Sequence, residues 1–148
     1  MSAVPVEKLS FGANWDPVDG QSIDLDLGCL MLDAETNVAD FVSFRHLTSN
    51  CGSISHGGDA RDDLGGDGDD EQIHVLVNEI PPTIQYVAFF ITCFDGKPLK
   101  YIDTCSGHLF ESETKRDLVM CDCVDENIKN HTAVLLCILY RAKGHWLF

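Results

Sequence analysis

The sequence predicts an all-β protein, a β-sandwich of two mostly antiparallel sheets with one or two short helices. Many short segments show the two-residue alternation of half-buried strands or the β-branched and aromatic composition of buried ones. Turn-forming residues separate these segments, and almost no stretch has the 3.6-residue periodicity of a long helix. A length of 148 residues suits one core, so we expect a single domain over residues 1–148.

The chain begins with a stretch of mixed character and then enters a clear strand. Residues 1–22 show no sustained alternation, and we expect residues 1–10 to form a loosely ordered N-terminal arm. Residues 23–33 alternate between apolar and polar side chains, which is the pattern of a strand buried on one face. In that register Asp24 and Asp26 lie together on the polar face.

Further strands follow along the rest of the chain. A polar stretch from His46 leads into an acidic loop, after which the alternation resumes at Ile73. Residues 125–130 have the character of a short helix or turn. The expected strands are residues 38–44, 73–77, 84–94, 99–104, 107–111, 117–124, 132–141 and 145–148.

Residues 58–71 carry seven carboxylates and one arginine, in the order Gly-Asp-Ala-Arg-Asp-Asp-Leu-Gly-Gly-Asp-Gly-Asp-Asp-Glu. So many like charges must either be kept apart in water or be neutralised by a cation. Glycines at positions 65, 66 and 68 let the backbone turn tightly, so that carboxylate and carbonyl oxygens can converge. Ca²⁺ takes about 6–8 such oxygen ligands. The segment therefore predicts a calcium site, and a solvated loop without a ligand is the alternative.

Two common calcium motifs do not fit this loop. An EF-hand with Gly68 at its sixth position would place His74 at the twelfth, where a bidentate glutamate is required. Its flanks also read as strands rather than helices. The glycine-rich nonapeptide of calcium β-rolls fits residues 65–70 but fails at Gln72, and it occurs once where stacked copies are needed.

A larger pattern, taken in order along the chain, does match a family. Its parts are Asp24-Leu25-Asp26 with Met31-Leu32-Asp33, Gly58-Asp59, Asp67-Gly68-Asp69-Asp70-Glu71-Gln72-Ile73, and the closing Leu139-Tyr140-Arg141 and Trp146-Leu147-Phe148. In this order the chain resembles the tellurium-resistance TerD family over nearly its whole length. Typical members carry a longer insertion after the strand at 84–94, so the chain is similar to a divergent member.

The resemblance implies a β-sandwich that binds calcium, with a link to stress resistance in bacteria (tellurite, phage and colicins). A cyclic-AMP-binding protein of slime moulds is related to the same family. About eight carboxylates exceed the need of one cation, so we expect one or two Ca²⁺ ions. Carried over residue by residue, the metal ligands would be Asp24, Asp26, Asp59, Asp67, Asp69, Asp70 and Glu71.

Charge and composition limit the partners. A net charge of -14 and a pI near 4.5 argue against nucleic acid, whose phosphates must be met by Lys and Arg. No apolar run reaches the ~20 residues of a membrane-spanning helix, and no signal peptide is visible. We therefore expect a cytoplasmic protein whose seven cysteines are reduced and act as small hydrophobes.

Three functions remain in order of preference. The first is a non-enzymatic, calcium-dependent module of the stress response that binds an unidentified protein partner, with a small-molecule ligand left open. The second is a structural or assembly subunit whose sandwich mediates protein–protein contacts. The third is a metal-dependent hydrolase, but no Gly-x-Ser-x-Gly, His-Glu-x-x-His or phosphate-loop motif is present, and we name no catalytic residue.

Overall fold

The computed structural model describes residues 7–20, 25–59, 69–93, 98–122, 131–143 and 145–148. Two short 3-10 turns, η1 and η2, accompany the strands in this part of the chain. The elements are β1 (Lys8–Pro17), β2 (Leu25–Leu32), β3 (Val38–Val42), β4 (Ile54–Asp59), β5 (Glu71–Leu76), η1 (Val77–Glu79), β6 (Tyr86–Cys93), η2 (Leu99–Tyr101), β7 (Ile102–Glu111), β8 (Asp117–Asp122), β9 (Ala133–Ala142) and β10 (His145–Leu147).

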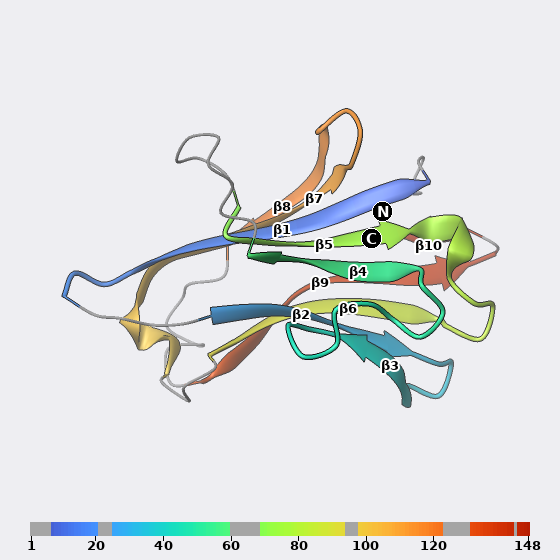
Figure 1. Cartoon of the computed structure of the whole chain (residues 1–148), viewed down its shortest axis with the longest axis horizontal. Coiled ribbons are helices and arrows are strands. Elements are labelled where there is room, and N and C mark those ends of the chain that lie inside the picture. Colours follow the sequence, from blue (N-terminus) through green and yellow to red (C-terminus); the bar gives the residue numbers. More distant parts are fainter. Residues whose placement is uncertain (1–6, 21–24, 60–68, 94–97, 123–130, 144) are drawn as a thin grey trace.

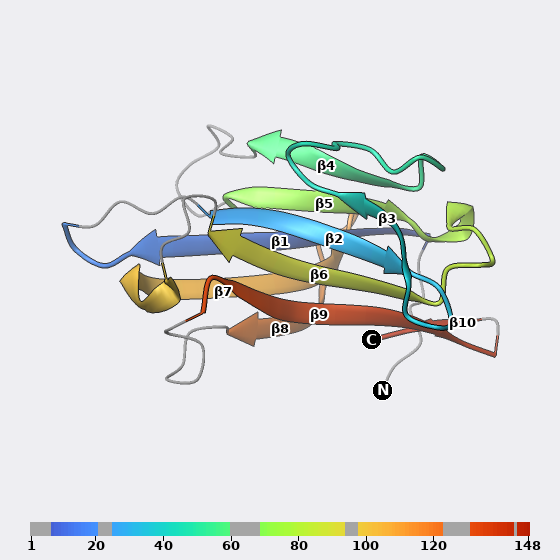
Figure 2. The same ribbon diagram turned by 90° about the horizontal axis from the view of Figure 1, so that it is seen from below.

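The strands form two five-stranded sheets that lie face to face (Figure 1). One has the order β4-β5-β1-β7-β8 and is called the β1 sheet below; the other has the order β10-β9-β6-β2-β3 and is called the β2 sheet. Every described pairing is antiparallel. The predicted β-sandwich is therefore confirmed, and the same two layers are seen from the β2 side in Figure 2.

The core lies between the two sheets and is built by alternation along the strands. Leu9, Phe11 and Ala13 of β1 are completely buried, as are Leu25 and Leu27 of β2. Large buried side chains of this kind stabilise the fold by about 1.5–3 kcal/mol each through the hydrophobic effect. The rings of Phe11 and Phe89 stack across the interface with centroids 4.7 Å apart. A continuous apolar layer therefore holds the sheets together.

Two strands were not predicted. β1 begins at Lys8, so residues 8–10 belong to a central strand and not to the expected arm, while residues 1–6 lie outside the described part. β1 lacks a clear strand pattern because its outer face carries small residues such as Ser10 and Gly12. These weaken the apolar–polar alternation by which a strand is predicted. β4 is similar, because it reads Ile-Ser-His-Gly-Gly-Asp. Tertiary pairing with β5 overrides this low strand propensity.

Two other expectations change in the second half of the chain. The strands expected at 99–104 and 107–111 are instead η2 followed by the single long strand β7. Cys105 is disulfide-bonded, contrary to the expectation of seven reduced cysteines. Free thiols in the described residues are Cys29, Cys51, Cys93, Cys121 and Cys137. The helix or turn expected at 125–130 lies outside the described residues.

The strand that carries Asp26 and the strand that begins at Glu71 belong to different sheets. β2 pairs with β6 along its whole length, but its pairing with β3 starts only at Cys29. The first part of β2, from Leu25 to Gly28, therefore has one edge without a partner strand among the described elements. This unpaired edge is where the β1 sheet contributes a side chain.

Candidate functional site

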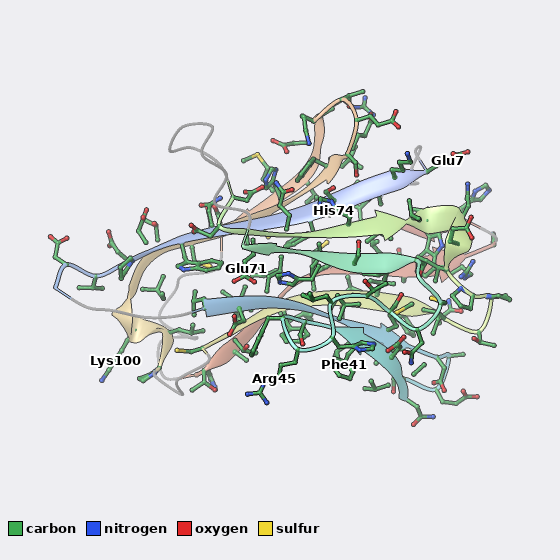
Figure 3. The ribbon with its side chains drawn as sticks, in the orientation of Figure 1. Glu7, Phe41, Arg45, Glu71, His74 and Lys100 are labelled. Atoms are coloured by element: carbon green, nitrogen blue, oxygen red, sulfur yellow. The ribbon has the colours of Figure 1, made fainter. Side chains whose placement is uncertain are left out.

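The acidic segment ends in three consecutive acidic residues, Asp69, Asp70 and Glu71, just where β5 begins. Their side chains lie at three different places in the fold. Asp69 lies on the outer face of the β1 sheet, the face turned away from the β2 sheet. Asp70 meets the backbone of β1. Glu71 lies between the two sheets, whereas His74 further along β5 lies on the outer side (Figure 3).

Asp69 is held by side chains from three strands. His108 Nε2 lies 2.9 Å from both carboxylate oxygens, and Gln72 Nε2 donates to Oδ2 at 2.9 Å. Asn14 Nδ2 adds a long contact of 3.5 Å to Oδ1. Gly12 lies beneath the carboxylate, and a Cβ there would sit 2.0 Å from Asp69 Oδ2. The close approach of Asp69 to the sheet therefore requires glycine at position 12.

The contact between Asp69 and His108 is electrostatic as well as geometric. The hydrogen bond to Asp69 raises the pKa of His108 to about 9, against the opposing effect of burial, and a 2.5 Å contact between Nδ1 and Asp117 Oδ1 adds to it. Burial alone would raise the pKa of Asp69, but its hydrogen bonds to His108 and Gln72 outweigh burial, and the net shift is downward. At neutral pH the pair is therefore an imidazolium and a carboxylate.

Asp70 fastens the segment to the backbone of β1. Its Oδ2 accepts a hydrogen bond of 2.9 Å from the Trp15 backbone N–H. Its own N–H donates to the Ala13 carbonyl at 2.9 Å. These two bonds lie immediately beyond the last paired position of the β1–β5 ladder, Ala13 with Glu71. The chain is thus fixed on β1 immediately before it enters β5.

Glu71 joins the two sheets. Its Oε1 accepts a hydrogen bond of 3.1 Å from the Leu27 backbone N–H of β2 and lies 2.8 Å from His56 Nε2 of β4. The His56 side chain is only 2% exposed and that of Glu71 13% exposed. Within the described residues both hydrogen bonds use the same oxygen of Glu71. The carboxylate therefore caps the unpaired edge of β2 and satisfies a buried histidine at the same time.

The remaining expected ligands do not converge with these three in the described residues. Asp26 stands between the completely buried Leu25 and Leu27, so its side chain is on the outer face of the β2 sheet. Asp59 pairs with Glu71 through its backbone, but its side chain lies outside the described part, as do residues 24 and 67. The described part of the chain contains no group of three or more His, Cys, Asp or Glu side chains placed to hold a metal.

Sequence reasoning missed the residues that hold the acidic segment. His108 is 39 positions from Asp69 and His56 is 15 positions from Glu71, so no local spacing links them. Only the strand register, which sets Gly12 opposite both Gln72 and His108, brings the outer cluster together. The small residues Ser10 and Gly12 at alternating positions of β1 were the signal in the sequence. They could have predicted an outer face with room for a side chain from another strand.

The fold and the site define the class of protein: a two-sheet antiparallel β-sandwich in which an anchored acidic segment leads into β5. The chain belongs to the TerD domain family, whose family model matches residues 2–148. Tellurium resistance protein TerZ of Serratia marcescens is 31% identical over 154 residues, covering 97% of this chain and 78% of its own. Tellurium resistance protein TerD of the same organism is 30% identical, with coverages of 99% and 80%.

Other relatives carry stress names, and solved structures share the fold. General stress protein 16U of Bacillus subtilis is 29% identical over 153 residues, with coverages of 97% and 78%. The unknown-function protein SAV2460 superposes with a TM-score of 0.77 at 21% identity, covering 97% of this chain and 86% of its own. A Streptomyces coelicolor homologue of the telluride resistance protein TerD gives 0.74 at 20% identity, with coverages of 96% and 86%. Among the described helical elements, none is long and apolar enough to cross a membrane.

Proposed function

We propose that this protein is a non-enzymatic, calcium-binding module of the stress response, which acts in the cytoplasm by calcium-dependent binding of a protein partner. Membership of the TerD family supports the stress role, since the relatives are named as tellurium resistance and general stress proteins. The single observation that carries the calcium part is the anchoring of residues 69–71 by three separate elements at the end of an acidic, glycine-rich segment.

Anchoring favours metal binding because it reduces the number of residues that must become ordered when the ion binds. A flexible loop loses conformational entropy of about 1–2 kcal/mol per fixed residue when it closes on a cation. Here residues 69–71 are already held by His108, Trp15 and Leu27, so the C-terminal side of the loop is in place. The donor type also fits, since carboxylate oxygens are what Ca²⁺ prefers.

The same contacts assign different roles within the proposed ligand set. Both oxygens of Asp69 face His108, and Glu71 uses Oε1 for Leu27 and His56. In this arrangement the carboxylates of Asp69 and Glu71 anchor the acidic segment to the β-sandwich. Asp59 and Asp67 would then supply inner ligands of the ion, Asp70 would add the oxygen that does not accept from the Trp15 N–H, and Asp69 would join only if it gives up its bond to His108.

In the described part of the chain, Ser10 and His74 form a contact that resembles a nucleophile and its base, but the burial of Ser10 argues against catalysis. Ser10 Oγ lies 2.7 Å from His74 Nδ1, and burial lowers the pKa of His74. However, Ser10 is completely buried, and its Oγ also lies 2.8 Å from Ser112 Oγ. A nucleophile must reach its substrate, so this hydroxyl is better explained as a packing contact within the outer face of the β1 sheet.

Thermal unfolding with and without calcium tests the proposal. A ligand that binds only the folded state at about 100 times its dissociation constant adds about 2.7 kcal/mol. For a domain of this size that corresponds to a rise in Tm of roughly 5–10 °C. We expect millimolar Ca²⁺ to give this rise and Mg²⁺ to give much less, because Mg²⁺ demands near-octahedral geometry and retains its waters. An unchanged Tm at saturating Ca²⁺ would remove the calcium part.

A further inference from the structure

Cys105 takes part in a disulfide bond, and the sequence leaves a single cysteine to be its partner. The chain contains seven cysteines. Cys105 is disulfide-bonded, and the five other cysteines of the described residues carry free thiols. The remaining one is Cys123, which lies outside the described residues. A disulfide within one chain therefore joins Cys105 to Cys123.

The strand register leads to the same pair independently. β7 and β8 pair Gly107 with Cys121 and Ser106 with Asp122. One further step in this register sets position 105 opposite position 123. Residues directly opposite in antiparallel strands have Cα atoms about 4.5–5.5 Å apart, and disulfides need about 4.4–6.8 Å. The pair that elimination leaves is thus the pair that the β7–β8 ladder favours.

The bond belongs to the inner face of the β1 sheet, beside a weakly held strand. Cys105 is 5% exposed. A Cβ at Gly107, two residues further on, would lie 2.7 Å from the Phe11 ring of the core, so both positions face inward. β8 is the outermost strand of this sheet (Figure 1), and no side chain along it is fully buried. The ladder to β7 and the disulfide would therefore be its main restraints.

We propose that the Cys105–Cys123 disulfide is a reversible thiol–disulfide switch, which fixes β8 on β7 when oxidised and releases it when reduced. Disulfides of cytosolic proteins from mesophiles are usually transient, catalytic or redox-sensing, so this step rests on the proposed cytoplasmic location and not on calcium. Elements with few buried contacts are the ones that open locally. Reduction should therefore loosen β8 and leave the strands that enclose the core in place.

The switch requires a dithiol as reductant and a small disulfide as oxidant. One thiolate of the dithiol attacks the sulfur of Cys123, because Cys105 is buried, and Cys105 leaves as a thiolate that takes up a proton. The second thiolate of the dithiol attacks the mixed disulfide and releases Cys123. The protein thereby gains two electrons and two protons, and the dithiol becomes a disulfide. Glutathione disulfide reverses the change and leaves as two glutathione thiols.

Two free thiols in this region do not compete for the bond. Cys121 Sγ donates to the Gly107 carbonyl at 3.4 Å. Burial raises the pKa of Cys121, and it raises the pKa of Cys137 on β9 to about 12. Because the thiolate is the attacking form, both side chains stay unreactive at neutral pH. Exchange is therefore confined to the Cys105–Cys123 pair while β8 is in place.

Thiol counting by mass spectrometry, in chelator so that calcium plays no part, tests the switch. Samples are quenched in acid, unfolded and alkylated. We expect five alkylated cysteines after glutathione disulfide, and seven after about 10 mM dithiothreitol without denaturant. Cys105→Ser and Cys123→Ser should each abolish this two-thiol response. Cys51→Ser is the matched control, because Cys51 is an exposed free thiol and its loss should leave the response intact.

Amide hydrogen exchange measures whether the bond holds β8. We expect residues 117–122 to exchange at least ~10-fold faster after reduction. β3, the edge strand of the other sheet, should be unchanged and serves as the internal control. Cys123→Ser should show the fast rate in both redox conditions. This variant keeps Cys105 in the core, so it decides the outcome if circular dichroism shows that Cys105→Ser does not fold.

Three results would overturn the proposal. A disulfide that dithiothreitol cannot reduce in the folded protein would be purely structural. Non-reduced peptides that link Cys105 to a cysteine other than Cys123, or a disulfide-linked dimer, would contradict the pairing. Equal exchange rates of β8 in the oxidised and reduced protein would show that the bond does not hold the strand. None of these results bears on calcium binding, because every sample contains chelator.

Discussion

His108 Nε2 lies 2.9 Å from both carboxylate oxygens of Asp69, although 39 residues separate the two in the chain. This contact ties the end of the acidic segment to β7, two strands away from β5 in the same sheet. The carboxylate crosses over β1 at Gly12 to make it. Composition alone would place this segment in solvent. The Asp69–His108 ion pair instead holds its end on the outer face of the β1 sheet.

Replacing His108 with alanine should destabilise the fold. Asp69 is 8% exposed, so the variant leaves a nearly buried carboxylate without its charged partner. We expect the free energy of unfolding, measured by urea denaturation, to fall by about 1–3 kcal/mol. His145→Ala is the control, because His145 is exposed at the start of β10. Equal losses in both variants would contradict a specific role for the Asp69 contact.

The same pair predicts a pH window for stability. The folded pKa of His108, about 9, exceeds its ordinary 6.5, so its contribution is complete below pH 6.5 and is lost as pH rises through 9. The folded pKa of Asp69 lies below its ordinary 3.8, so its contribution is present above that pH and is lost as pH falls further. Thermal unfolding across this range should show a decline from pH 6.5 to 9 that is absent in His108→Ala.

Gly12→Ala should be destabilising only while Asp69 is present. The added Cβ would fall 2.0 Å from Asp69 Oδ2, so the carboxylate must leave its place over β1. We expect a loss of about 1–3 kcal/mol in the wild-type background, because the ion pair between the nearly buried Asp69 and the half-buried His108 is broken. In an Asp69→Ser background the loss should shrink markedly, and a double-mutant cycle measures the difference. Additive losses would show that Gly12 matters for another reason.

Glu71→Ala should loosen the contact between the sheets. The variant removes the acceptor of the Leu27 N–H and of His56, whose side chain is 2% exposed. We expect a loss of about 1–3 kcal/mol in stability and faster amide hydrogen exchange at Leu27. Glu113→Ala, at a side chain 78% exposed, should change neither. Unchanged protection of the Leu27 amide would contradict the capping role of Glu71.

The parts of the fold that local pattern could predict were those with strong alternation. β2 and β6 follow from their own apolar residues, and the register that buries Leu25, Leu27 and Cys29 is confirmed. β1 and β4 could not be predicted, since Gly12 in β1 and the Gly-Gly of β4 are strand-like only through the neighbours that pair with them. Side-chain alternation finds a strand that is apolar on one face and overlooks one with glycine on the other.

The candidate site shows the same division. The acidic segment and its family could be found from the sequence, because the glycine and aspartate order is local. Whether the strand of Asp26 and the strand that begins at Glu71 share a sheet could not be predicted: β2 and β5 lie in different sheets, and a hydrogen bond from the Leu27 backbone N–H to Glu71 joins them across the interface. Which strands stack depends on the whole topology, and two-residue periodicity carries no such information.

The central claim, that the anchored acidic segment binds Ca²⁺, is tested most directly by isothermal calorimetry. Wild-type protein, Asp67→Asn/Asp69→Asn and the control Glu35→Gln/Glu113→Gln would each be titrated with Ca²⁺. Both double variants remove two negative charges, and the control acids are exposed and lie outside the segment. We expect saturable binding to the wild type and the control, and binding weakened at least ~10-fold, about 1.4 kcal/mol, in Asp67→Asn/Asp69→Asn. Absence of saturable heat in the wild type, or equal weakening in both variants, would contradict it.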